Sequence, residues 1–286
     1  MPRDAGFSRW VADLAQLTEG EVIAIDGKTI RRSLDTASKK AAIHMVSAWA
    51  QQNRLVLGQE KVDDKSNEIT AIPKLLKQLD ITGAVVTIDA MGRQKKIARQ
   101  VVGQGGDYVL SLKGNQSALH DDVVTWFQSS LSAQEATIDV DAGHGRIETR
   151  QLRTSNDIQW LKARHPDWKG LQSIVEVTSQ RELKEKTETE TRYFISSLDD
   201  RNPVPLGQAI RGHWGIENSL HWVLDVAFDE DRNRARKGHS ATNLAMIRHL
   251  ALNLIQQEKT AKVGVKTKRA KAGWDNQYLL KILDMI

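Results

Sequence analysis

The pattern of apolar and polar positions changes period twice in the first eighty residues. Residues 7–17 repeat apolar side chains at helical spacing, which predicts an amphipathic N-terminal helix over residues 1–20 that ends near Gly20. Three runs rich in β-branched residues follow at 21–26, 41–50 and 54–62, separated by polar stretches, and they predict an antiparallel meander. Residues 66–79 return to a helical pattern, with Pro73 as an expected kink or break.

Strands and helices then alternate as far as residue 113. A buried run at 83–92 ends in an aspartate, 93–105 is helical in pattern, and 107–115 forms a further apolar run. The order β-β-β-α-β-α-β predicts an α/β fold with a mixed sheet flanked by helices, because β-α-β crossovers produce parallel strands. Such sheets place their working residues at the carboxyl ends of the strands.

The second half of the chain predicts a β-rich insertion followed by long helices. Residues 135–200 contain alternating runs around Gly-rich or charged turns, whereas 209–228 and 240–257 are helical in pattern, with Ser240 as the expected N-cap of the latter. We therefore divide the chain into four parts: an N-terminal helix (1–20), a core (21–134 and 201–258), the insertion (135–200) and a basic C-terminal segment (259–286).

Composition limits the class of protein. The 286-residue chain is 40% hydrophobic and has no cysteine, which excludes disulfides and cysteine-based zinc sites. Neither a signal peptide nor an apolar run of about 18 residues is evident, so we expect a cytoplasmic protein without a membrane partner.

The net charge is +5, and residues 259–271 carry six cations and no acid. This run suits either a phosphate backbone or a solvated, mobile tail.

Asp26 and Asp89 are the two aspartates that end apolar strand runs. On neighbouring strands their carboxylates would repel each other unless a cation lay between them, and oxygen ligands favour Mg²⁺ or Mn²⁺. Either aspartate alone also fits an ordinary turn, particularly in the Asp-Gly pair at 26–27. The cations that follow each aspartate favour a site for an anionic substrate: Lys28, Arg31 and Arg32 after the first, and Arg93, Lys95 and Lys96 after the second.

Glu217 is the best candidate for a third carboxylate. It lies in the helical run 209–228, where His213, Glu217 and His221 recur every four residues on one predicted face. Two histidines and a carboxylate on one face also fit a zinc site, although the H-E-x-x-H signature is absent. A polar stripe without any function is a third interpretation.

Six motifs in order resemble those of the insertion-sequence transposases of the H-repeat-associated group, a branch of the DDE transposases with a ribonuclease-H-like catalytic core. They are VIAIDGKTIRRS, VVTIDAMGRQKKIA, YVLSLKGNQ, GHGRIETR, HWGIENSLHWVLDVAFDEDRNRAR and NLAMIRHLALNLI. The resemblance implies a mixed five-stranded sheet flanked by helices, with a β-rich insertion before the third acid. It also implies that Asp26, Asp89 and Glu217 are the three catalytic acids.

The resemblance further implies DNA contacts, which we expect at Lys113, His144, Arg146, Arg211, His213 and Asn218. Related branches carry a Tyr, an Arg and a Lys on the acid-bearing helix, and Ile210, His213 and Leu224 hold those spacings here. Family members usually have an additional N-terminal region, so we expect this chain to be a truncated copy.

The leading hypothesis is a DNA transposase with two Mg²⁺ or Mn²⁺ ions about 3.5 to 4 Å apart, which cut the element ends and position the 3′-hydroxyl for attack on target DNA. Its partner would be double-stranded DNA in the nucleoid, bound at synapsis by at least a homodimer. One alternative is a zinc hydrolase that uses His213, Glu217 and His221. The other is a non-catalytic relic that binds DNA through the cations between Lys259 and Lys271.

Overall fold

A computed structural model describes the chain at residues 19–35, 41–63, 66–89, 94–114, 117–129, 137–143, 146–183, 186–199 and 202–284. The helix expected over residues 1–20 lies outside the described residues, apart from a turn at its last two positions. The chain divides into two compact units. The first unit comprises Met1–Asp80 and Gly212–Ile286, and the second comprises Ile81–Arg211.

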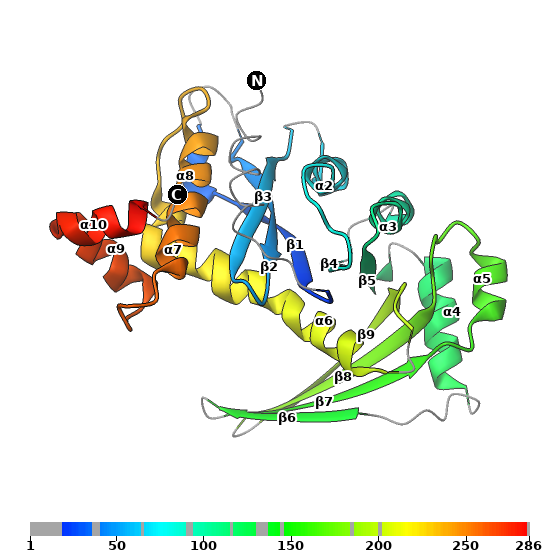
Figure 1. Cartoon of the computed structure of the whole chain (residues 1–286). Coiled ribbons are helices and arrows are strands. Elements are labelled where there is room, and N and C mark those ends of the chain that lie inside the picture. Colours follow the sequence, from blue (N-terminus) through cyan, green and yellow to red (C-terminus); the bar gives the residue numbers. More distant parts are fainter. Residues whose placement is uncertain are drawn as a thin grey trace. The chain divides into compact units, whose positions relative to one another are not determined.

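The predicted meander forms the sheet of the first unit. Strands β1 (Val22–Thr29), β2 (His44–Ala50) and β3 (Leu55–Lys61) are antiparallel, in the spatial order β3-β2-β1. Helix α2 (Glu68–Leu76) packs beside them and buries Ile72, Leu75 and Leu76 (Figure 1). The helix continues past Pro73, so the expected break does not occur.

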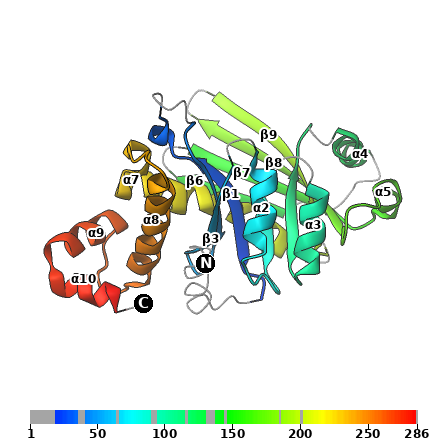
Figure 2. The ribbon, with the colours of Figure 1, turned by 90° about the horizontal axis from the view of Figure 1, so that it is seen from above.

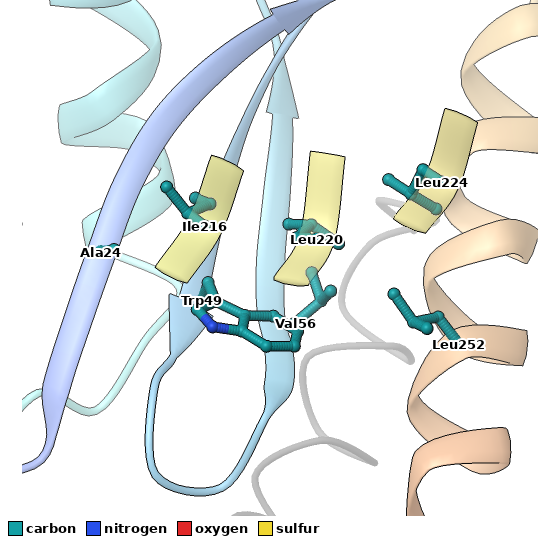
Figure 3. Close-up of a cluster of buried hydrophobic side chains, with 7 residues drawn as sticks. All are labelled: Ala24, Trp49, Val56, Ile216, Leu220, Leu224 and Leu252. Carbon is teal, nitrogen blue, oxygen red and sulfur yellow. The ribbon is translucent and has the colours of Figure 1, made fainter. Parts of the chain in front are cut away.

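The helix that carries Glu217 runs in three consecutive pieces: α6 (Val204–Gly215), a π-helical segment (Ile216–His221) and α7 (Trp222–Phe228). Its apolar side chains at 216, 220 and 224 pack against Ala24, Trp49, Val56 and Leu252, as Figure 3 shows. In a regular α-helix, residues four apart drift by about 40° around the axis, and the wider π turn offsets this drift. The sequence pattern predicted a helix here but not the π segment.

Three further helices of the first unit lie in the described part of the chain. Helix α8 (Ser240–Gln257) is followed by α9 (Val265–Trp274) and α10 (Asn276–Leu283), which lie against its end (Figure 2). A cluster of Leu254, Ile255, Tyr278 and Ile282 is buried between them. The basic C-terminal segment is therefore folded, and the interpretation as a mobile tail is wrong. Ser240 begins α8, but the N-cap position belongs to His239.

Glu258 anchors this C-terminal helix pair. Its carboxylate is fully buried and accepts hydrogen bonds from the Tyr278 hydroxyl at 2.9 Å and from the Thr260 N–H at 2.8 Å. The Lys268 ammonium lies 3.3 Å from it. Burial raises the pKa of Glu258, but hydrogen bonds from Thr260, Tyr278 and the Ala261 N–H outweigh this effect and hold the pKa well below its usual range.

The second unit contains β4 (Val85–Ile88), β5 (Asp107–Leu112), β6 (Thr137–Gly143), β7 (Arg146–Ser155), β8 (Ser173–Leu183) and β9 (Lys186–Ser196). Their order is β4-β5-β9-β8-β7-β6, with β4 and β5 parallel and the later pairs antiparallel. Helices α3 (Gln94–Gly103), α4 (Ser117–Gln128) and α5 (Gln159–Arg164) accompany them. Two short 3-10 helices, Arg31–Ser33 and Glu230–Arg232, belong to the first unit.

The described elements confirm the mixed α/β class and the ribonuclease-H-like order β-β-β-α-β-α-β. The strands β6 to β9 also confirm the β-rich run before Glu217. They do not form a separate sheet, because β9 pairs with β5 through Val109 and Ser196. The four-part domain division stays a prediction.

We predict that Glu258→Gln lowers the free energy of unfolding by about 3 to 5 kcal/mol at pH 7, because the change leaves Lys268 buried without its counter-charge. Urea unfolding followed by circular dichroism measures this loss. The exposed Glu188→Gln serves as the control and should change little.

The same pair predicts a pH dependence. Because the folded-state pKa of Glu258 is lowered, its stabilising effect is complete above the unfolded-state value near 4.5 and disappears as the pH falls through the folded-state value. The difference between wild type and Glu258→Gln should therefore shrink on acidification below about pH 4.5. A difference that grows on acidification would contradict the assigned role.

Candidate active site

Asp26 lies where β1 leaves the hydrophobic core. The strand is buried from Val22 to Ile25, half-buried from Asp26 to Lys28 and exposed at Thr29. The Asp26 side chain is 25% exposed, and its Oδ2 lies 3.5 Å from Nδ1 of His221 in the π segment. The Asp26 side chain is therefore partly exposed to solvent and also lies beside the π segment.

His221 is uncharged at neutral pH. Its side chain is 13% exposed. Burial, with smaller electrostatic effects from Lys28, His44 and His213, lowers its pKa to about 4. A neutral imidazole does not offset the charge of the Asp26 carboxylate. Among the described residues, the buried Nε2 of His221 has no hydrogen-bond partner.

Lys28 lies two residues after Asp26 on the same face of β1. Its Nζ is 2.6 Å from Asp225 Oδ1, 2.9 Å from Glu230 Oε2 and 3.6 Å from Asp231 Oδ1. The side chain is only 12% exposed. Burial lowers the pKa of Lys28, but Glu230 and Asp225 together raise it above its ordinary value, so the ammonium stays charged.

The expected contact of Lys28 with DNA phosphate stays a prediction. The ammonium group already faces three carboxylates inside the first unit. Removing one partner of such a buried pair typically costs about 3 to 5 kcal/mol, because a charge stays buried without compensation. The geometry therefore favours a structural role for Lys28.

Helix α8 places a second cation, Arg248, beside one of these carboxylates. The Arg248 guanidinium is 3.7 Å from Glu230 Oε1. Burial, followed by electrostatic interactions with His221, Lys28 and Arg248, lowers the pKa of the fully buried His249 to about 3, so His249 is also neutral at pH 7. The buried charges of Lys28 and Arg248 thus share the Glu230 carboxylate.

The opposite face of β1 explains the glycine after Asp26. His44 Nε2 lies 2.5 Å from Glu68 Oε1, and His44 Nδ1 lies 2.8 Å from the Thr29 hydroxyl. A Cβ at Gly27 would come within 2.1 Å of the Glu68 carboxylate and 2.3 Å of the His44 ring. Gly27 lies inside β1, so the interpretation of the Asp-Gly pair as a turn is wrong.

Glu217 and Asn218 are exposed on the π segment, whereas His213 is half-buried. His221 lies beside Asp26, whereas the side chain of Glu217 is exposed to solvent. Within the described part of the chain, no three His, Asp or Glu side chains are grouped so that they could hold a metal ion. His213, Glu217 and His221 all belong to the first unit, and in the described structure they are not grouped as a metal site.

Asp89 follows β4 in the second unit, as predicted. Its Oδ2 lies 2.7 Å from the Lys113 Nζ, and Lys113 follows the parallel neighbour β5. The carboxyl ends of the two strands therefore place an acid beside a base. Both side chains are about half exposed, so this ion pair is weak.

The other predicted DNA contacts are distributed over both units. Arg31 is 82% exposed and 3.4 Å from Asp231, and Arg32 and Lys96 are also exposed. Within the second unit, Lys95 pairs with Asp167 at 2.9 Å and Arg211 with Asp141 at 3.2 Å. Arg93 and His144 lie outside the described residues, and the side chain of Arg146 in β7 is not described.

Sequence reasoning missed the carboxylates around Lys28. Asp225 and Glu230 stand in the quoted run LDVAFDEDRNRAR, whose density of acids was the available signal. Its importance becomes visible only when the run is folded back onto β1, roughly 200 residues away along the chain.

Comparisons with known proteins identify the family. The sequence model described as "Transposase DDE domain" matches residues 17–254. The chain is 44% identical to "Putative transposase YncI" of Escherichia coli O157:H7, over 97% of this chain and 72% of that protein. It is 40% identical to "H repeat-associated putative transposase YhhI" of Escherichia coli strain K12, over 97% of this chain and 75% of that protein. The chain belongs to the DDE transposase family, in its H-repeat-associated group.

A solved structure also aligns with the chain. It is described as a cryo-EM structure of the piggyBac transposase synaptic complex with hairpin DNA. The alignment has a TM-score of 0.46 and 12% identity, and it covers 94% of this chain and 58% of that one. In the described residues, no helix is long and apolar enough to cross a membrane.

We predict that Gly27→Ala destabilises the protein by about 1 to 3 kcal/mol, because the added methyl group forces His44 and Glu68 apart. Thermal unfolding would measure the change. Gly103→Ala is the matched control, since a Cβ there meets nothing within 4 Å, and it should be neutral or slightly stabilising. Equal stability of Gly27→Ala and wild type would refute the crowding at β1.

Proposed function

We propose that this chain catalyses metal-dependent DNA strand cleavage and strand transfer, with Asp26, Asp89 and Glu217 as the catalytic carboxylates. The observation that carries the proposal is the surroundings of Asp26. A partly buried carboxylate at the point where a buried strand leaves the core lies beside a neutral histidine of the helix that carries Glu217. Membership of the DDE transposase family supports the same assignment.

The chemistry of these donors fits a hard divalent cation. Three carboxylates offer oxygen ligands, the chain has no cysteine, and DDE transposases generally use divalent metal ions. We propose two Mg²⁺ or Mn²⁺ ions, which when bound would polarise the phosphate and lower the pKa of the attacking water or hydroxyl. Asp26, Asp89 and Glu217 would be their protein ligands.

Two further groups of residues have roles in this proposal. His221 and Lys113 affect the charge around the catalytic carboxylates, and exposed cations bind DNA. Neutral His221 leaves the negative charge of Asp26 in place for a cation, whereas Lys113 partly neutralises Asp89 in the protein alone. Exposed cations such as Arg31, Arg32 and Lys96 suit the DNA backbone, and phosphate contacts of this kind position DNA without reading its sequence.

The proposed reaction determines the partners. The substrate would be double-stranded DNA at the element ends and at the target, encountered in the cytoplasm at the nucleoid. Joining two ends requires two active sites, so we propose at least a homodimer during synapsis.

We expect Asp89→Asn to reduce Mg²⁺-dependent cleavage of a DNA end by at least about 100-fold, because one oxygen ligand loses its charge and metal catalysis contributes several kcal/mol. Gel assays of labelled duplexes carrying a family element end would measure the rate. Asp229→Asn is the matched control: Asp229 is exposed at a φ of 51°, a left-handed conformation that asparagine tolerates. Unchanged cleavage by Asp89→Asn would overturn the proposed mechanism.

We also expect Arg31→Gln and Lys96→Gln each to weaken binding to duplex DNA and to reduce the slope of log affinity against log salt by about 0.9, since each removes one phosphate contact. Fluorescence anisotropy between 50 and 200 mM salt would measure both quantities. An unchanged slope for both variants would show that DNA lies elsewhere.

A further inference from the structure

One face of β1 contacts the helix that carries Glu217 at three successive positions. Ala24, Asp26 and Lys28 share this face because they are two residues apart. Ala24 packs in the cluster of Ile216 and Leu220, Asp26 lies beside His221, and Lys28 pairs with Asp225. Two strand residues rise about 6.6 Å and four residues of a regular α-helix such as α7 about 6 Å, so β1 and α7 stay aligned from Asp26 to Lys28.

Lys28 is the last of these three strand residues, and its contacts with the helix and the segment after it are ion pairs. Its ammonium binds Asp225 of α7 at 2.6 Å and Glu230 of the following 3-10 helix at 2.9 Å. The chain continues the connection, because the Arg31 N–H donates to Asp231 Oδ1 at 3.3 Å. The strand that carries Asp26 is thus joined, a few residues further on, to the segment that follows Glu217.

We propose that Lys28 is a positioning residue that fixes the register between the strand of Asp26 and the helix of Glu217. This inference rests on the proposed function, in which these two carboxylates act together. Lys28 does not touch DNA or the reacting atoms, but acts through the position of Asp26.

The charges make the register specific. If the helix moved by one turn along β1 in one direction, Asp26 would face Asp225, and two carboxylates would repel each other. If it moved in the other direction, Lys28 would lose Asp225 and face the buried His221 ring, leaving its ammonium without that counter-charge. Hydrophobic packing by Ile216, Leu220 and Leu224 lacks this directionality, so the ion pairs supply it.

The test compares Lys28→Met with Lys28→Arg, which keeps the charge, and with Lys77→Met, the same change at an exposed lysine of the first unit. Three quantities are measured on the full chain: the Mn²⁺ concentration for half-maximal DNA cleavage, the hydrogen exchange of peptides covering 22–29 and 216–228, and the salt dependence of DNA binding. Asp225→Asn, which weakens the same contact from the half-exposed side, serves if Lys28→Met does not fold.

For Lys28→Met we expect a rise of about 10- to 100-fold in the required Mn²⁺ concentration, typical of lost support around a metal ligand. Exchange should become faster in both peptides, and the salt slope of DNA binding should not change. Lys28→Arg should recover most of the loss, and Lys77→Met should match wild type. A salt slope reduced by about 0.9 with unchanged exchange would instead make Lys28 a phosphate contact and overturn the proposal, as would no change in any of the three quantities.

Failure of the proposed function gives a different result. If wild type shows no metal-dependent cleavage, the assigned reaction is wrong. Hydrogen exchange and the amount of bound Mn²⁺, measured by electron paramagnetic resonance, then still decide whether Lys28 fixes the register of the two elements.

Discussion

The buried ammonium group of Lys28 is the constraint around which the first unit is organised. A charge that is 12% exposed requires counter-charges, and three carboxylates from α7 and the following 3-10 helix provide them. The requirement joins residues about 200 positions apart and places β1 along the helix that carries Glu217. On the other face of the same strand, the His44–Glu68 contact leaves room for no side chain at Gly27. Asp26 is therefore held in a strand that is restricted on both faces.

Local patterns were sufficient for the order of elements. The alternation of β-branched runs and helical spacing predicted the meander, the parallel pair β4 and β5, and the long helices, because burial on one face leaves a readable period. The π segment escaped prediction, since periodicity cannot distinguish a wider turn from a regular one over six residues. The basic C-terminal segment could be interpreted from its sequence either as a DNA-binding surface or as a mobile tail. Its high density of cations did not indicate the apolar contacts of Tyr278 and Ile282 or the buried ion pair of Lys268 with Glu258.

The candidate site was predictable only in part. Asp26 and Asp89 stood out because each ends a buried run, and the described structure has them at such positions in β1 and after β4. From the sequence we predicted that Lys28 contacts DNA, because sequence alone does not distinguish an exposed lysine from a buried one. The partners Asp225 and Glu230 depend on long-range folding, which no local rule encodes. The Asp-Gly pair likewise suggested a turn, because the contact between His44 of β2 and Glu68 of α2 that crowds Gly27 cannot be read from the sequence.

The central claim is that Asp26, Asp89 and Glu217 jointly hold divalent metal. Its most direct test is a crystal of the chain with duplex DNA of an element end, soaked in Mn²⁺ and measured by anomalous scattering. The account predicts Mn²⁺ peaks bounded by these three carboxylates, with Lys28 still bound to Asp225 and Glu230. A peak at His213 and His221 instead, or three ordered carboxylates without any peak in the presence of DNA, would contradict it.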